Sequence, residues 1–288
     1  QTCALPISYF GDGENEAQMV YQFSLPPLVL HAVHRQDVKA LCQWAGSLAL
    51  PSSHTTWFNF LASHDGIGLN PLRGILPESE ILSLVENLQQ EGALVNWKNN
   101  PDGTRSPYEI NVTYLDALSL QDSSDEERIA RFLLAHAVLL SFPGVPAVYI
   151  QSILGSRNDY EGVERLGYNR AINRKKYTAG QLDSELNNKK SIRYQIYSRL
   201  SEFIAIRRGE RAFHPDSQAA FDAVGKQILK IIRVAENGER ITALFNFSNK
   251  MQTVYEQTLS GKELLSGQDI SGTELILNPW QVMWIKEN

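Results

Sequence analysis

The sequence is poor in cysteine, in long apolar runs and in excess charge of either sign. Its 288 residues include 2 cysteines, Cys3 and Cys42, which is too few for a disulfide framework or a zinc-finger spacing. The longest apolar stretches, such as residues 132–140 and 145–150, fall short of the roughly 20 residues that span a bilayer. The 27 basic and 32 acidic side chains give a net charge of −5, whereas nucleic-acid binders show a basic excess. These absences predict a cytoplasmic protein whose partners include neither nucleic acid nor a membrane.

What the chain does contain is an ordinary globular composition, with 43% apolar and 20% charged residues. A disordered chain has fewer apolar residues and a larger net charge for its length. The length suits two domains of average size, or one barrel of roughly 250 residues with an appendix. A third interpretation, which we favour, is that the chain is part of a larger protein.

The first residues differ from an ordinary protein start. The chain begins with Gln1 rather than methionine, and residues 1–8 (QTCALPIS) lack the basic region and long apolar core of a signal peptide. Translated backwards, they fit one reading frame of a common sequencing-library adapter followed by a partial codon. We expect residues 1–8 to be an assembly artefact on a gene truncated at its 5′ end. The alternative is a natural start trimmed of its methionine.

Two strands are expected early in the chain. Residues 19–23 are rich in aromatic and β-branched side chains, and Pro26-Pro27 ends that stretch. Apolar residues then recur at helical spacing over 28–45. Residues 57–62 (WFNFLA) are almost continuously apolar, which is typical of a strand buried on both faces of a parallel sheet.

Residues 69–121 predict an inserted subdomain, because no strand–helix unit of the same kind occurs there. This segment holds a predicted helix over 77–92, a stretch over 96–107 that is rich in turn-forming residues, and strand-like residues over 108–118.

A helix with a capped, acidic start is predicted over 122–140. His136 lies on the apolar face of this helix, where packing is favoured over a ligand role. A buried strand at 147–150, a polar loop to about residue 185 and an amphipathic helix at 194–208 are expected to follow.

Beyond residue 212 the apolar period changes to two, which predicts an antiparallel β domain over 212–288. Its expected strands are 227–234, 240–247, 251–255, 262–264, 275–277 and 281–285. The order of elements predicts an α/β fold in which residues 9–211 are the last βα units of a (β/α)8 TIM barrel. A doubly wound sheet remains the alternative.

His64 and Asp65 follow the apolar strand 57–62 directly, and in a βα barrel reactive groups lie at the carboxyl ends of the strands. A carboxylate beside an imidazole suits a sugar site: Asp65 can hold ring hydroxyls and stabilise an oxocarbenium-like charge, while His64 donates to a neighbouring hydroxyl. The alternative is that Asp65 only caps the turn before Gly66.

Four motifs resemble the α-amylase superfamily, glycoside hydrolase family 13. Residues 60–68 (FLASHDGIG) resemble its strand-seven motif, and the trailing Gly-Ile-Gly is similar to its sucrose-phosphorylase branch. Residues 143–150 (PGVPAVYI) resemble strand eight, and the resemblance extends to 155–159 (GSRND) and 170–174 (RAINR). It covers nearly everything from residue 9 to residue 288.

The resemblance implies roles for individual residues. Asp65 corresponds to the transition-state-stabilising carboxylate, and His64 to its hydroxyl-binding partner. Arg170 corresponds to the arginine that grips the far hydroxyls of the glucosyl ring, unless it is a solvated loop cation; Ala171 departs from the aspartate often found beside it. Tyr108 resembles the mobile-loop tyrosine that helps to admit phosphate, with packing of the insertion as the alternative.

The implied activity is that of a retaining disaccharide α-glucosyl phosphorylase, in which inorganic phosphate is the co-substrate. The nucleophilic Asp and the acid/base Glu of such enzymes belong to earlier barrel strands, so we expect this chain alone to be inactive. No cofactor and no metal is expected, the implied partners are a sugar and phosphate, and a homodimer is a candidate assembly.

The acceptor is left open among fructose, a phosphorylated fructose, glycerol and glycerate. Residues 160–165 (YEGVER) and the 106–109 loop (SPYE) resemble glucosylglycerate and related phosphorylases more than sucrose enzymes. Arg157 and Arg165 are candidates to hold a carboxylate or phosphate on the acceptor. The alternatives are a hydrolase or transglucosidase of the same superfamily and a non-catalytic carbohydrate-binding protein.

Overall fold

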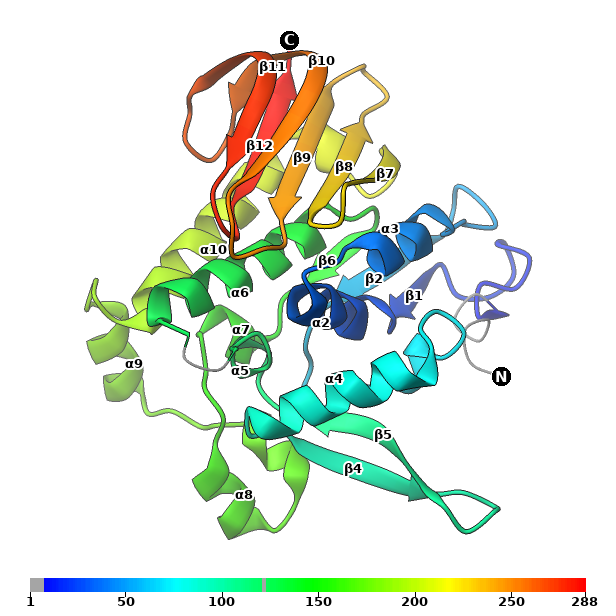
Figure 1. Ribbon diagram of the computed structural model, residues 1–288, viewed down its shortest axis with the longest axis vertical. Coiled ribbons are helices and arrows are strands. Elements are labelled where there is room, and N and C mark those ends of the chain that lie inside the picture. The colour runs from blue at the N-terminus through cyan, green and yellow to red at the C-terminus, as the bar shows by residue number, and fades with distance from the viewer. Residues whose placement is uncertain (1–7, 121–122) are drawn as a thin grey trace.

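The computed structural model describes residues 8–120 and 123–288 of the chain (Figure 1). The predicted adapter segment therefore lies outside the described residues, apart from Ser8.

A parallel sheet of three strands positions the candidate site. It consists of β1 (Met19–Gln22), β2 (Thr56–Phe60) and β6 (Val145–Ala147) in the order β1-β2-β6. The first two strands confirm the predictions for 19–23 and 57–62. The prediction for 147–150 was wrong at both ends: the strand begins at Val145 and ends at Ala147, and Tyr149 is already the N-cap of α7 (Ile150–Ile153).

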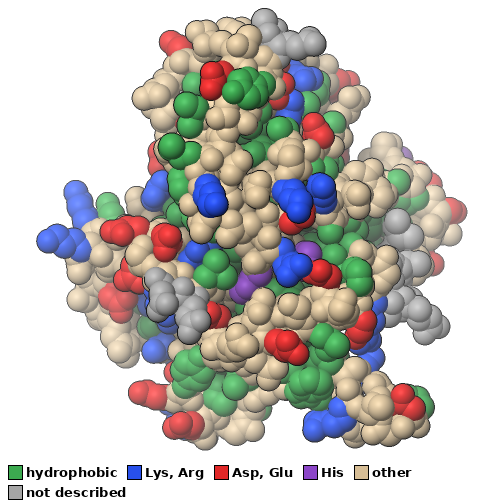
Figure 2. Space-filling view, viewed as in Figure 1, with side chains coloured by type: hydrophobic (Ala, Val, Ile, Leu, Met, Phe, Trp, Pro, Cys, Tyr) green, Lys and Arg blue, Asp and Glu red, His purple; other side chains and the backbone are tan. Residues whose placement is uncertain are grey.

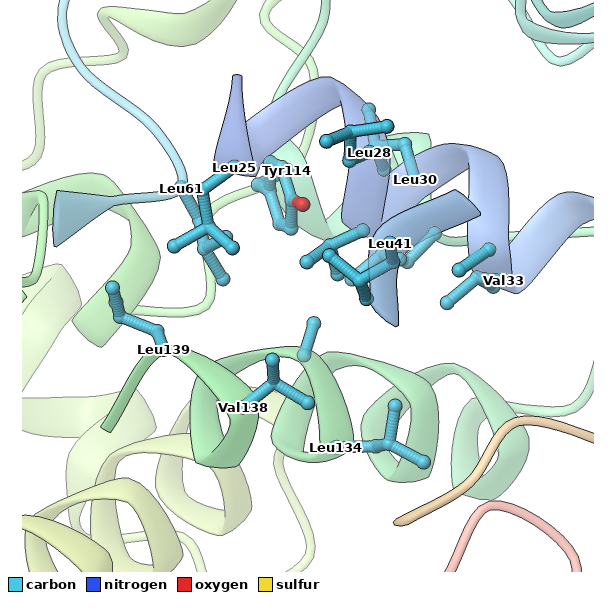
Figure 3. Packing of buried hydrophobic residues seen from close by; sticks show 14 of the residues in the cluster. Leu25, Leu28, Leu30, Val33, Leu41, Leu61, Tyr114, Leu134, Val138 and Leu139 are labelled. Carbon is cyan, nitrogen blue, oxygen red and sulfur yellow. The ribbon is translucent and has the colours of Figure 1, made fainter. Parts of the chain in front are cut away.

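Helical crossovers join these strands, as parallel pairing requires. Between β1 and β2 lie α2 (Leu25–Arg35), whose first turn contains Pro26 and Pro27, and α3 (Lys39–Gly46). Prolines are tolerated in the first helical turn because its N–H groups have no partner within the helix. Between β2 and β6 runs α6 (Asp125–Ser141), which confirms the predicted helix. Figure 3 shows Leu28 and Leu41 on one side facing Leu134 and Val138 of α6 on the other.

The segment between β2 and α6 contains α4 (Glu78–Gln90) and a three-stranded antiparallel sheet of order β3-β5-β4. Its strands are β3 (Ile67–Gly68), β4 (Leu94–Asn99) and β5 (Arg105–Asn111). The helix prediction for 77–92 is confirmed. The turn-rich stretch 96–107 is instead a hairpin, because its turn residues are confined to the tip and the flanking residues pair. The expected strand 108–118 ends at Asn111, and α5 (Tyr114–Ala117) follows with Thr113 as its cap.

The predicted polar loop up to residue 185 is wrong, because it contains α8 (Tyr160–Leu166), the 3₁₀ helix η2 (Asn169–Asn173) and α9 (Ala179–Leu186). Side-chain caps start two of these elements: Asp159 accepts from the amide of Gly162, and Thr178 forms a capping box with Gln181. Polar composition hid them because a short exposed helix carries little apolar periodicity. The long α10 (Ile192–Gly209) confirms the next prediction.

The C-terminal sheet is antiparallel and has six strands in the order β11-β10-β12-β9-β8-β7. Its strands are β7 (Gln218–Val224), β8 (Ile228–Val234), β9 (Arg240–Asn246), β10 (Gln252–Glu263), β11 (Asp269–Leu277) and β12 (Val282–Glu287). The sequence missed β7 and divided β10 into two strands. Phe203 of α10 and Phe213 pack on Trp284 of β12, at ring-centroid distances of 5.4 and 4.9 Å, and so join this sheet to the helical layer. Parallel strands with helical crossovers followed by an antiparallel sheet confirm the predicted fold class.

Charge on the molecular surface is mixed. Figure 2 shows basic and acidic side chains interspersed on the displayed face, without an extended patch of one sign. Within residues 8–120 and 123–288, no helix is both long and apolar enough to cross a bilayer.

Candidate active site

The loop that follows β2 carries His64 and Asp65 at the carboxyl end of the parallel sheet. Ser63 Oγ accepts a hydrogen bond from the Asp65 amide at 3.1 Å, and Asn173 Nδ2 donates to the Asp65 carbonyl at 2.9 Å. Arg174 Nε donates to the His64 carbonyl at 2.6 Å. The η2 segment, 105 or more residues further along the chain, therefore fixes the backbone of this loop.

Two guanidinium groups converge on one oxygen of Asp65. Arg170 NH1 lies 2.6 Å and Arg174 NH2 3.3 Å from Oδ1. Asp65 remains 41% exposed, and among the described residues its Oδ2 accepts no hydrogen bond. With two guanidinium groups at one oxygen, the second oxygen of this carboxylate is available to a ligand hydroxyl.

His64 stands beside this carboxylate without binding it closely. Its Nε2 lies 3.6 Å from Asp65 Oδ1, beyond ordinary hydrogen-bond length, and the imidazole is 69% exposed. The ring is therefore free to turn toward a ligand hydroxyl, and the hydroxyl-binding role of His64 stays a prediction.

Sequence reasoning assigned no role to two residues of this cluster, namely Arg174, described above, and Glu109. Its buried carboxylate, 7% exposed, accepts from Arg170 Nε at 3.0 Å and from Arg170 NH2 at 2.7 Å. These hydrogen bonds raise the pKa of the Arg170 guanidinium above its ordinary value. A Cβ at Gly66 would lie 2.6 Å from Glu109 Cγ, so glycine is required there for this approach. The available signal was that an acidic residue on the buried face of a strand needs a cation.

Tyr108 precedes Glu109 on β5, and its backbone carbonyl accepts from the Leu69 amide at 2.9 Å. Glu109, the next residue, binds Arg170, so the backbone of Tyr108 lies beside this cluster. The role that the resemblance implies for its phenol stays a prediction.

Arg157 and Arg165 lie apart from this group. Arg157 Nε donates to Asp116, a carboxylate that also accepts from the Asn158 amide at 2.7 Å. Arg165 is exposed in the last turn of α8. Among the described residues, neither arginine contacts Asp65 or Arg170, and their proposed roles stay predictions.

We also asked whether side chains are arranged to bind a metal ion. In the part of the chain that the structure describes, no group of three or more His, Cys, Asp or Glu side chains is arranged to hold a metal ion. The charged groups that meet at Asp65 are instead two carboxylates and two guanidinium groups.

Comparison with known proteins gives close relatives but no matching family model. The chain is 66% identical to the glucosylglycerate phosphorylase of Escherichia coli over 97% of its own length and 50% of that protein. It is 42% identical to the glucosylglycerate phosphorylase of Allomeiothermus silvanus, covering 97% of this chain and 49% of that one. It is 30% identical to the sucrose phosphorylase of Agrobacterium vitis, covering 88% and 51%. The chain spans about half the length of the curated relatives it matches.

Solved structures share the fold. The crystal structure of sucrose 6F-phosphate phosphorylase from Thermoanaerobacter thermosaccharolyticum superimposes with a TM-score of 0.70 at 20% identity, over 93% of this chain and 50% of that one. The α-amylase from H. orenii superimposes with a TM-score of 0.62 at 10% identity, over 100% and 52%. At these identities the likeness establishes the fold alone.

Proposed function

Because this chain belongs to the branch of glycoside hydrolase family 13 that contains the glucosylglycerate and sucrose phosphorylases, we propose that it supplies one half of a retaining disaccharide α-glucosyl phosphorylase. The reaction converts an α-glucoside and phosphate into α-glucose 1-phosphate and the free acceptor. The observation that carries the proposal is the half-exposed Asp65 carboxylate, held by Arg170 and Arg174 at the carboxyl end of β2.

In this proposal Asp65 stabilises the transition state. A nucleophilic carboxylate attacks the anomeric carbon while a carboxylic acid gives its proton to the departing acceptor oxygen. Both groups belong to the half of the relatives that this chain does not span. Asp65 accepts hydrogen bonds from ring hydroxyls at its free Oδ2, and its negative charge stabilises the positive charge that develops on the sugar. Phosphate oxygen then bonds to the anomeric carbon and displaces the enzyme carboxylate.

Phosphate must outcompete water in the second step, which requires groups that attract an anion. We assign this work to Arg174, 32% exposed beside Asp65, and to Tyr108 on β5. The other guanidinium, Arg170, is committed to two carboxylates and serves the glucosyl ring.

Glycerate is the acceptor that the two glucosylglycerate phosphorylase relatives favour. Of the two arginines proposed for its carboxylate we favour Arg165, because Arg157 is already bound to Asp116. The enzyme would need no cofactor, and phosphate is its co-substrate. Scarce cysteine, with Cys42 a buried free thiol, supports a reducing, cytoplasmic setting.

A chimera tests the proposal in a protein of full length. Residues 9–288 replace the matched half of the Escherichia coli glucosylglycerate phosphorylase, so that this chain's own site operates beside a complete partner half. With glucosylglycerate and phosphate, the expected product is α-glucose 1-phosphate, and omission of phosphate stops turnover. Release of glucose at equal rate without phosphate would instead establish a hydrolase or transglucosidase.

The 288-residue chain by itself is the control that lacks the partner half, to which we assign the nucleophile and the acid/base. It should show no turnover under the same conditions. Sugar binding without turnover in both proteins would support the carbohydrate-binding alternative, and light scattering of the chimera tests the proposed homodimer.

A further inference from the structure

We infer that Glu109 is a positioning residue that holds the Arg170 guanidinium in the orientation in which NH1 meets Asp65. The expected effect on kinetics rests on the proposed function, whereas the positioning itself does not. The geometry itself comes from contacts among β5, η2 and the loop after β2.

Glu109 and Arg170 form a two-point contact. Glu109 Oε1 accepts from Arg170 Nε at 3.0 Å and Oε2 accepts from NH2 at 2.7 Å, which fixes the guanidinium plane. NH1 then extends to Asp65 Oδ1 at 2.6 Å. Of the five guanidinium N–H groups, these contacts use three, so one on NH1 and one on NH2 remain for a ligand.

Glu109 is itself held from its other side. Asn96 Nδ2 on β4 donates to Glu109 Oε1 at 3.2 Å, and Asn169 Nδ2, next to Arg170, donates to Asn96 Oδ1 at 2.7 Å. Because Asn169 and Arg170 are neighbours in the sequence, the hydrogen bonds among Asn96, Glu109 and these two residues form a closed ring. The inserted hairpin β4–β5 is thereby tied to the residue that grips the sugar.

Burial separates the roles of the two carboxylates that share Arg170. The Glu109 side chain is 7% exposed, whereas the Asp65 side chain is 41% exposed and accepts from Arg170 at one oxygen. A sugar hydroxyl that reaches the site can displace the NH1–Asp65 contact, because water and ligand have access to it. The two Glu109 contacts persist, since leaving the buried Glu109 carboxylate unpaired is costly. Glu109 therefore keeps Arg170 in place while Asp65 exchanges partners.

The chimera described above allows a direct test. Glu109→Gln removes the charge and one acceptor while keeping the size of the side chain. Misplacement of a substrate-gripping group by about 1 Å costs on the order of 100-fold in rate, and we expect a fall of that order in kcat/KM for glucosylglycerate. Glu109→Asp, which keeps the two-oxygen fork, should recover part of the loss.

A double-mutant cycle separates positioning from a general structural effect. Arg170→Lys removes the planar fork that Glu109 holds, so adding Glu109→Gln to it should lower kcat/KM little further. The matched control is Glu263→Gln, another buried glutamate that accepts three backbone hydrogen bonds, far along the chain in the C-terminal sheet. This control should lower the melting temperature and leave kcat/KM of the folded enzyme unchanged.

The outcomes distinguish this inference from the proposed function. Additive losses in the cycle, or unchanged kcat/KM in Glu109→Gln, would overturn the positioning role in an active chimera. If the unsubstituted chimera does not use phosphate, the proposed function fails, and the crystal structure of Glu109→Gln decides the geometry. Arg170 NH1 should then lie beyond 3.5 Å from Asp65, and an unmoved guanidinium would refute the inference.

Discussion

At the scale of single residues, burial decides which polar side chains are structural. His136 is fully enclosed in α6, its ring 4.0 Å from the ring of Phe132 in centroid distance, and its Nδ1 hydrogen-bonds the Phe132 carbonyl at 2.9 Å. Removal from water lowers the pKa of His136 from 6.5 to about 4. The imidazole is therefore neutral at ordinary pH, in agreement with the packing role that the sequence favours.

This lowered pKa predicts a pH-dependent stability. Between pH 6.5 and 4 the unfolded chain binds a proton at residue 136 that the folded chain does not, so the free energy of unfolding falls as pH falls through this window. The loss attributable to His136 is about 3 kcal/mol by pH 4. His34, whose pKa is also lowered by burial, acts in the same direction.

Denaturant titrations from pH 7.5 to 4 measure the effect, and His136→Leu isolates it. The variant should lose less stability than the parent across the window because residue 136 no longer titrates. Parallel pH curves for the two proteins would contradict the assignment.

The motifs of the sequence singled out Asp65, His64, Arg170 and Tyr108, and the structure places Arg170 and His64 beside Asp65. No role was assigned to Arg174 or to the buried Glu109. Glu109 escaped because its role depends on a pairing across 61 residues with Arg170, which no local pattern encodes. Arg157 was proposed from its motif alone, and its contact with Asp116 is likewise a property of the folded chain.

At the scale of elements, local capping signals specify helix starts. Ser124 accepts from the Glu127 amide, and the Glu127 side chain accepts from the Ser124 amide, which completes a capping box at the start of α6. Three acidic residues in the first turn, Asp125, Glu126 and Glu127, add a favourable interaction with the helix dipole.

Ser124→Ala should lower the free energy of unfolding by about 1 kcal/mol, because one amide loses its capping partner. The measurement is a denaturant titration monitored by circular dichroism. Ser271→Ala, at an exposed position of β11, is the control and should change stability little. Equal stability of Ser124→Ala and the parent would show that the cap contributes nothing.

Elements with strong periodicity were predictable, and those defined by tertiary contact were not. The helices α4, α6 and α10 and the strands β1 and β2 follow their patterns. The strand β7 alternates only weakly, and it forms because it pairs with β8 over seven residues and brings Phe221 against Phe142. Pairing partners are long-range information that propensity does not contain.

At the scale of the whole molecule, one face of the parallel sheet is aromatic and open to solvent. Tyr21 and Phe23, 54% and 49% exposed, contact Phe60, and Tyr21 also contacts Phe58. Parallel sheets are normally covered on both faces, and the β1 and β6 edges are unpaired among the described strands. A complete barrel would enclose this face.

The aromatic face predicts that one substitution benefits the 288-residue chain and harms the chimera. In the 288-residue chain, Phe23→Lys should reduce self-association measured by light scattering, because it interrupts an exposed apolar patch. In the chimera the same change should lower stability, since a lysine would then be buried in the barrel. If Phe23→Lys left the stability of the chimera unchanged, the barrel interpretation would be contradicted.

Family membership was predictable from four short motifs, and the relatives confirm it. The fold class followed from the order of strands and helices and is likewise confirmed. The acceptor was not predictable, because the motifs that identify the family are shared by relatives named for different acceptors.

The most direct measurement of the central claim is the effect of Asp65→Asn on phosphorolysis by the chimera. The variant keeps the shape of the side chain and removes the charge that opposes the developing oxocarbenium ion, so kcat should fall at least about 10²-fold. Asp269→Asn, at an exposed position of β11, is the matched control and should retain full activity. If Asp65→Asn phosphorolyses glucosylglycerate as fast as the unsubstituted chimera, Asp65 is not a catalytic carboxylate and the account is wrong.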